Sequence, residues 1–385
     1  MSNCSLYGAY CDKASREWSS YYEIHILPRN LFQENQEDTL EKCRDFVKSH
    51  YETGNKAEAM NFPFEREYEH SDRHVHMVSL YLLGLYLRNS FCESVRDEFF
   101  RNIRGDRSWY DFEYTWFLTC LYHDTASCVE KKSIPANPSE WQKNLKYYMD
   151  ALALRNSPYT VASGANSFCK KTIRFRGSDE LAKSYFYYRA NQGSYDHGII
   201  GGYLLYNRLL ENFEKKTAEH DWSKEPYKED KNSGGHFLWW RKNHPDHYAY
   251  IADAIICHNM WTTSVEDTKK AAEYRGYGLN GLIINEKSER LSRERFPLQF
   301  MLCLLDTIEP VKRFSKLSAK EILENISIEM INRNQIKVGW SARIKQEPEF
   351  WLWMKNISDL KGWMQVNVSI CRQESEWCYI TIDIE

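Results

Sequence analysis

Histidine and aspartate side chains beside strongly apolar segments are the groups in this sequence that could do chemistry. The stretch MLCLLDTIEP, for example, surrounds Asp306 with leucine and isoleucine. A carboxylate buried among such residues is costly unless a cation or hydrogen-bond donors compensate its charge. Because several groups of this kind lie on separate predicted helices, the sequence predicts a shared metal site. The candidate ligands are His76, His123, Asp124, His197, His258 and Asp306.

The first histidine of this series could be His70, His74 or His76. On one helix His70 and His74 would share a face, whereas His76 would lie about 200° from His74. Apolar residues occur on both sides of this segment, so hydrophobic periodicity leaves the choice open.

The segments that must position these residues are predicted to be helices, because apolar residues between about 35 and 315 recur mostly at helical spacing. Gly201 and Gly202 are expected to permit close packing of their helix. The polar segment 215–236, with its charges, proline and Gly-Gly pair, is expected to be an exposed loop. The predicted helices cover residues 36–51, 72–90, 111–123, 139–153, 178–190, 196–214, 245–258 and 296–308.

After about residue 317 the apolar residues alternate at period two, which predicts strands. ISIEMIN and QIKVGW flank one polar turn, and MQVNVSI and CYITIDI flank RQESEW. The segment EPEFWLWMKNISDL between these hairpins has helical spacing, so a small ββ-helix-ββ appendage is expected to follow a mostly α-helical body. It is expected to pack through Trp351, Trp353 and Trp363. The predicted domains are an N-terminal extension at 1–34, a helical metal-binding domain at 35–316 and this α+β domain at 317–385.

Composition and charge exclude several classes of protein. A hydrophobic content of 42% with 27% charged residues excludes collagen-like, low-complexity and largely disordered chains. A net charge of −3 gives no field for general nucleic-acid or anionic-membrane binding. The eleven cysteines form no CxxC pair, and neither a signal segment nor an apolar run of about 18 residues is present, which predicts a cytoplasmic protein. The P-loop, GxSxG and HExxH motifs are also absent.

The ordered pattern H…HD…H…H…D resembles the HD-domain superfamily of metal-dependent phosphohydrolases. The phrases HMVSLYLLG, LYHDTASCVE, YDHGIIGGYLL and DAIICHN carry this resemblance, which covers about residues 70–310. It implies an HD-type helical bundle and favours His76, through its spacing from the LLG that follows, as the first ligand. It also implies that His76, His123, Asp124 and Asp306 surround one metal ion. Asp124 would bridge to a second ion held by His197 and His258.

Mixed nitrogen and oxygen ligation suits one or two divalent transition-metal ions, drawn from Mn, Fe, Zn, Ni and Co. Two close cations can deprotonate a bridging water and neutralise charge on a phosphoryl oxygen, so His123 and Asp124 are the expected catalytic residues. Further candidates around the metals or the substrate are Asp196, His74, His247, Glu130 and Lys131. Of these, Asp196 is predicted to be a helix N-cap, with a ligand or proton-relay role as the alternative. His247 is predicted to lie at the surface, with contact to substrate phosphate as the alternative.

The sequence departs from the family pattern at two points. The Lys or Gly that often follows the HD pair is missing from HDTASCVEKK, where Lys131 or Lys132 could replace it. A single histidine, His258, stands where some members have a His-His pair. The GYP motif of cyclic-dinucleotide phosphodiesterases is absent, so that substrate class is not expected.

The resemblance predicts an enzyme that hydrolyses a nucleotide or another phosphate ester at a dinuclear metal centre. One alternative is a non-catalytic nucleotide-binding or regulatory module. A second alternative is an HD-type di-iron oxygenase, which resembles the same ligand set. The expected partner is a phosphate-containing small molecule, with neither a membrane nor general nucleic acid as partner. The hairpins could also present an edge for a homodimer.

Overall fold

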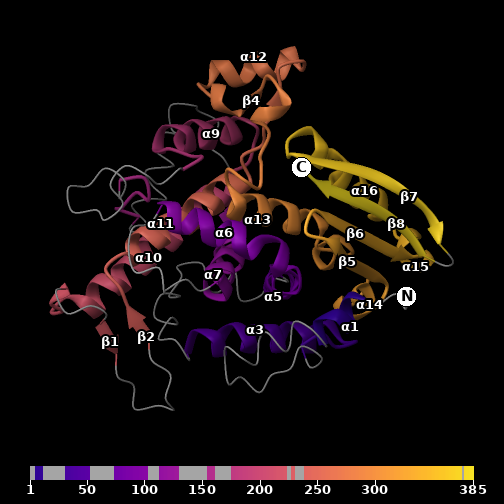
Figure 1. The fold of residues 1–385 in the computed structure, drawn as a ribbon, viewed down its shortest axis with the longest axis horizontal. Coiled ribbons are helices and arrows are strands. Elements are labelled where there is room, and N and C mark those ends of the chain that lie inside the picture. Colours follow the sequence, from indigo (N-terminus) through magenta and orange to yellow (C-terminus); the bar gives the residue numbers. More distant parts are fainter. Residues whose placement is uncertain are drawn as a thin grey trace. The chain divides into compact units, whose positions relative to one another are not determined.

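The computed structural model describes residues 5–11, 31–52, 73–102, 112–129, 154–160, 175–222, 227–229, 238–374 and 377–385. These residues are mostly helical, and a small antiparallel sheet lies near the C-terminus (Figure 1). This confirms the predicted class of a mostly α chain with a β-containing tail. The predicted helix at 139–153 lies outside the described residues.

The chain divides into two compact units, and each is discontinuous in sequence. Unit 1 comprises Met1–Ser49, Ser71–Ser94 and Glu286–Glu385, and unit 2 comprises His50–His70 and Val95–Asn285. The consecutive domains expected at 1–34, 35–316 and 317–385 stay a prediction.

The core of unit 2 consists of helices that carry four of the ligand candidates. Every residue of α7 is buried, and α10 and α11 pack along each other. Asp196 caps the N-terminus of α10, and Pro245 lies in the first turn of α11, where a missing backbone N–H is tolerated. These helices begin and end within three residues of the predicted positions. The elements are α7 (Phe112–His123), η4 (Thr125–Val129), α9 (Asp179–Asn191), α10 (His197–Thr217) and α11 (His244–His258).

Two glycines of α10 allow its neighbours to approach closely, as predicted. A Cβ atom on Gly201 would lie 2.5 Å from the carbonyl oxygen of Tyr122, the residue before His123. A Cβ atom on Gly202 would lie 2.5 Å from Cγ1 of Ile256 on α11. Any larger residue at either position would therefore push apart the helices that carry the ligand candidates.

The described parts of segment 215–236, residues 215–222 and 227–229, contain a helix end and a strand where an exposed loop was predicted. Helix α10 continues to Thr217, because its apolar face extends to the buried Phe213 and Thr217. Strand β1 (Tyr227–Glu229) then pairs antiparallel with β2 (Leu238–Trp240). This pairing gives the backbone N–H and C=O groups of β1 the hydrogen-bond partners that they require. The rest of unit 2 includes α12 (Thr268–Gly276), η7 (Asn280–Leu282), and the parallel pair β3 (Thr263–Ser264) and β4 (Ile283–Ile284).

Unit 1 contains α5 (Arg73–Tyr86), which packs against α13 (Pro297–Ile308) and η9 (Val311–Arg313). The single helix predicted at 72–90 is interrupted at Leu87, and α6 (Arg88–Asn102) begins directly after it. The interruption arises because the amide of Ser90 donates to the carbonyl of Leu87, three residues back rather than four. Further elements that begin in this unit are α1 (Leu6–Ala9), α3 (Gln36–Glu52), η8 (Lys287–Glu289) and α14 (Ala319–Glu324).

The C-terminal part of unit 1 has the predicted ββ-helix-ββ arrangement. Its four strands pair antiparallel in the order β5-β6-β8-β7, so the two hairpins join through β6 and β8 (Figure 1). Val338 pairs with Ile380, and both side chains are buried on the inner face. The elements are β5 (Ile326–Asn332), β6 (Gln335–Ser341), α15 (Ala342–Lys345), α16 (Phe350–Asp359), η10 (Leu360–Gly362), β7 (Val366–Glu374) and β8 (Trp377–Ile384).

The three tryptophans expected to pack this tail behave differently. Trp353 is buried and meets the ring of Phe314 edge-on at 5.6 Å. Trp363 is half-buried. The expectation for Trp351 is wrong, because its side chain is 66% exposed. Each residue of a helix turns the side-chain direction by about 100°, so Trp351 and Trp353, two positions apart, point about 200° apart, and burial of Trp353 turns Trp351 outward.

Candidate metal centre

The six predicted ligands fall into two groups, one in each compact unit. His76 and Asp306 belong to unit 1, on α5 and at the end of α13. His123, Asp124, His197 and His258 belong to unit 2, at the ends of α7, α10 and α11. Helix ends leave unpaired backbone groups that can orient such side chains.

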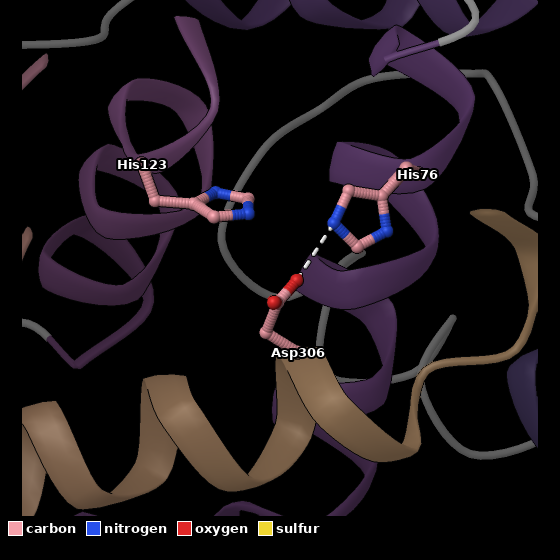
Figure 2. A group of neighbouring side chains, drawn as sticks. All are labelled: His76, His123 and Asp306. Atoms are coloured by element: carbon pink, nitrogen blue, oxygen red, sulfur yellow. Dashed lines mark hydrogen bonds and ion pairs between the residues drawn. The ribbon is translucent and has the colours of Figure 1, made fainter. Parts of the chain in front are cut away.

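In unit 1, both ring nitrogens of His76 face a carboxylate. Its Nε2 lies 2.9 Å from Oδ1 of Asp306, and its Nδ1 lies 2.7 Å from Oε2 of Glu309. Figure 2 shows the His76 ring directed at the Asp306 carboxylate. In the tautomer with its hydrogen on Nδ1, the ring donates to Glu309, which holds it in place, and Nε2 keeps a lone pair for a metal ion. An imidazole oriented in this way by a carboxylate is typical of metal-binding histidines.

Glu309 is a member of this group that the sequence analysis missed. It is fully buried and also accepts hydrogen bonds from the Ser79 hydroxyl at 2.6 Å and the Val311 amide at 3.0 Å. Burial alone would raise the pKa of this carboxyl, but His76 and the hydrogen bonds outweigh it and lower the pKa. The sequence did contain a signal for Glu309. It lies three residues after Asp306, and residues at this spacing share one face of a helix.

Asp306 also carries a cationic partner. The ammonium group of Lys312 forms an ion pair with Oδ1 of Asp306, and Arg313 donates to the Asp306 backbone carbonyl at 2.7 Å. The Asp306 side chain is 19% exposed, so it lies at the boundary between core and solvent. A positive group therefore offsets the carboxylate charge, as the apolar sequence context requires.

In unit 2, the Asp124 carboxylate lies between two imidazoles. Its Oδ1 is 3.2 Å from Nε2 of His197, and its Oδ2 is 3.7 Å from Nε2 of His123. The Nδ1–H of His123 donates to the Cys120 carbonyl at 2.7 Å, because a carbonyl can only accept. This bond fixes the tautomer and turns Nε2 toward Asp124.

His258 has the same arrangement at the end of α11. Its Nδ1–H donates to the Ile255 carbonyl at 2.6 Å. Its ring centre lies 5.4 Å from that of His123 and 5.2 Å from that of His197, so unit 2 brings all three imidazoles together. Gly198 makes room for this ring, because a Cβ atom there would lie 2.9 Å from His258 Nδ1.

Asp196 is the N-cap that was predicted. Its Oδ1 accepts from the Ile199 amide at 2.9 Å, and its Oδ2 accepts from the Asn259 side chain at 3.0 Å. The carboxylate therefore joins the start of α10 to the residue that follows His258. In this way it fixes two predicted ligands relative to each other.

The remaining candidates lie elsewhere. His247 is fully buried rather than at the surface, and its Nε2 is 2.9 Å from the Thr115 hydroxyl, on the first turn of α7. Burial, together with nearby His244, lowers the pKa of His247 well below its ordinary value. His74 is buried on α5, but His76 makes the bonds to Asp306 and Glu309. Glu130, Lys131 and the alternative ligand His70 lie outside the described residues.

The donor atoms of each group fit metal ligation. Ligand atoms bound to one transition-metal ion at 2.0–2.2 Å lie roughly 3 to 3.5 Å apart. The His76–Asp306 distance of 2.9 Å and the His197–Asp124 distance of 3.2 Å match this spacing. Imidazole nitrogen with carboxylate oxygen suits Mn, Fe, Zn, Ni or Co.

The chain has no match among protein-family models, curated proteins or solved structures. In the part of the chain that the structure describes, no helix has both the length and the apolar character needed to cross a membrane.

Proposed function

We propose that this chain is a metal-dependent phosphohydrolase of the HD-domain type, acting on a nucleotide or a related phosphate ester. The observation that carries the proposal is the placement of Asp124, whose two oxygens face two different imidazoles. A carboxylate in this position can ligate two metal ions at once, which is the role that the family resemblance gives to Asp124.

The orientation of the histidines supports the same proposal. His76, His123 and His258 each donate Nδ1–H to a fixed oxygen, at 2.7, 2.7 and 2.6 Å. Outer hydrogen bonds of this kind set the tautomer and ring angle of metal ligands. Three of the proposed ligands, on three different helices, share this feature.

The family resemblance implies that His76, Asp306, His123 and Asp124 would hold one metal ion, and that Asp124, His197 and His258 would hold a second. Such ions, when bound, lower the pKa of a water ligand and stabilise charge on phosphoryl oxygens. Glu309 keeps the His76 ring in place, and the Cys120 and Ile255 carbonyls do the same for His123 and His258.

Lys312 is the residue that we assign to the substrate phosphate. The sequence offered Lys131 or Lys132, after the HD pair, for this cation, and both lie outside the described residues. Lys312 already contacts Asp306, and its side chain is 16% exposed, so its ammonium group lies beside a proposed ligand. An ammonium group binds phosphate as a point charge.

The test is a panel of phosphate esters and nucleotides, assayed with Mn²⁺, Fe²⁺, Zn²⁺, Ni²⁺ or Co²⁺. Wild-type protein should release phosphate, and Asp124→Asn should be nearly inactive while its circular dichroism is unchanged. Asp267→Asn is the matched control, because asparagine also serves as an N-cap at the start of α12 and activity should remain.

The alternative functions are outcomes of the same assay. Absence of turnover with every metal, in protein that still binds nucleotide, would replace the phosphohydrolase proposal with a regulatory module. Consumption of dioxygen by iron-loaded protein without phosphate release would replace it with an HD-type oxygenase.

A further inference from the structure

A large aromatic side chain lies at the surface three residues after His258. Trp261 is 57% exposed, although it belongs to a segment between the buried Met260 and the buried Thr263. An indole ring left in water forgoes the stabilisation that burial would provide. Single exposed apolar side chains are common at protein surfaces, so it is the fixed position of this ring, rather than its exposure, that points to a role.

The backbone of Trp261 is fixed by two tyrosine hydroxyls. Its amide donates to Tyr185 Oη at 2.9 Å, and its carbonyl accepts from Tyr274 Oη at 2.9 Å. The rings of Tyr185 and Tyr274 are fully buried. The main chain at this exposed residue is therefore anchored in the core of unit 2.

The indole ring itself is oriented by a third hydrogen bond. Its Nε1–H donates to Oδ1 of Asn259 at 3.0 Å, and the same side-chain amide donates to Oδ2 of Asp196 at 3.0 Å. Asp196 immediately precedes His197, and Asn259 immediately follows His258. The angle of the ring is thus set by the two helix ends that carry these proposed metal ligands.

We infer that Trp261 is a binding site for the planar heteroaromatic ring of the ligand whose phosphate lies at the metal ligands. This inference rests on the proposed function, and it selects a nucleoside phosphate over phosphate esters that lack a ring. Base stacking on an exposed aromatic side chain is favourable for every base, because each base has a π face. A ring that is already fixed loses little conformational entropy on binding.

The experiment compares two ligands that cannot be hydrolysed: a nucleoside 5′-phosphonate, prepared with each of four bases, and the base-free ribose phosphonate. Their affinities are measured by calorimetry for wild-type protein and for Trp261→Ala, Trp261→Phe and Trp351→Ala. Trp351 is the matched control, because it is an exposed tryptophan of the tail. Elemental analysis of the same samples gives the metal content, and thermal melting confirms folding.

Trp261→Ala should bind the nucleoside phosphonates about 5- to 150-fold more weakly, as expected for the loss of one stacked base. Its affinity for ribose phosphonate and its metal content should equal those of wild type. Trp261→Phe should retain most of the affinity, and Trp351→Ala should retain all of it.

Equal binding of the nucleoside phosphonates by wild type and Trp261→Ala would overturn the inference. So would wild-type protein that shows no preference for the ligands with a base, or that binds neither ligand. Metal content separates the two claims. If wild-type protein holds metal but does not prefer the nucleoside phosphonates over ribose phosphonate, the ring site alone is refuted. If that preference is present and depends on Trp261 but the protein holds no metal, the metal centre alone is refuted.

Discussion

Replacing Glu309 with glutamine tests whether the carboxylate behind His76 prepares that ring for a metal. The carboxylate accepts from His76 Nδ1–H at 2.7 Å, from the Ser79 hydroxyl at 2.6 Å and from the Val311 amide at 3.0 Å. Glutamine has the same shape but only one accepting oxygen. Either the His76 N–H or the Val311 N–H must therefore face an amide NH₂ group.

One buried donor left without an acceptor costs about 1–3 kcal/mol, so Glu309→Gln should lower the free energy of unfolding by about that amount. The effect on metal binding is separate. Loss of an outer-shell partner typically weakens metal affinity 10- to 100-fold, which corresponds to about 1.4–2.7 kcal/mol.

The assay is competition with a chromophoric chelator, followed for Zn²⁺ and Mn²⁺ with wild type, Glu309→Gln and Ser79→Ala. Ser79→Ala removes one bond to Oε1 and leaves the His76–Glu309 bond in place, so its metal affinity should stay within about twofold while stability falls by about 1 kcal/mol. Equal metal affinity for Glu309→Gln and wild type would refute the role of Glu309. Equal weakening by both variants would show that the effect comes from stability alone.

Gly198→Ala should displace the His258 ring, whose Nδ1 lies 2.9 Å from the new Cβ position, and should reduce bound metal by up to one equivalent in elemental analysis without unfolding the chain. Asp253→Ala should lower the free energy of unfolding by about 3 kcal/mol in chemical denaturation, because two backbone amides and a tyrosine hydroxyl lose their acceptor. A decrease of less than about 1 kcal/mol would contradict this. Trp353→Ala should lower the free energy of unfolding by about 3–5 kcal/mol in the same assay, because the ring is buried. The exposed Trp351→Ala should change it by less than about 0.5 kcal/mol. Equal effects of the two variants would contradict the packing described for α16.

Hydrophobic periodicity was sufficient to predict most helices and both hairpins of the tail. It worked because α10, α11 and α13 are long apolar segments with clear first residues, such as the Asp196 cap and the prolines of α11 and α13. It failed at Leu87. There the Ser90 amide donates to a carbonyl three residues back, instead of four residues back as in an α-helix. That change leaves no mark on the apolar pattern.

The candidate ligands could be identified from the sequence, but their supporting contacts could not. Glu309 follows the end of α13, and its bond to His76 joins residues 233 positions apart. Asp253 lies on α11 and accepts from the amides of Arg176 and Gly177, which no spacing rule connects to it. His247 also appeared to be a surface residue after Pro245, but the approach of Thr115 and Phe99 buries it. Long-range packing decides these cases.

The most direct test of the central claim is the metal content of purified protein by elemental analysis, with the metal located by anomalous X-ray scattering. The proposed dinuclear centre requires about one or two transition-metal equivalents per chain in wild-type protein, with anomalous density beside Asp124. Replacing both His123 and Asp124 with alanine should remove most of this metal. Wild-type protein without a transition metal, or a double variant that holds as much metal as wild type, would contradict the proposed metal centre.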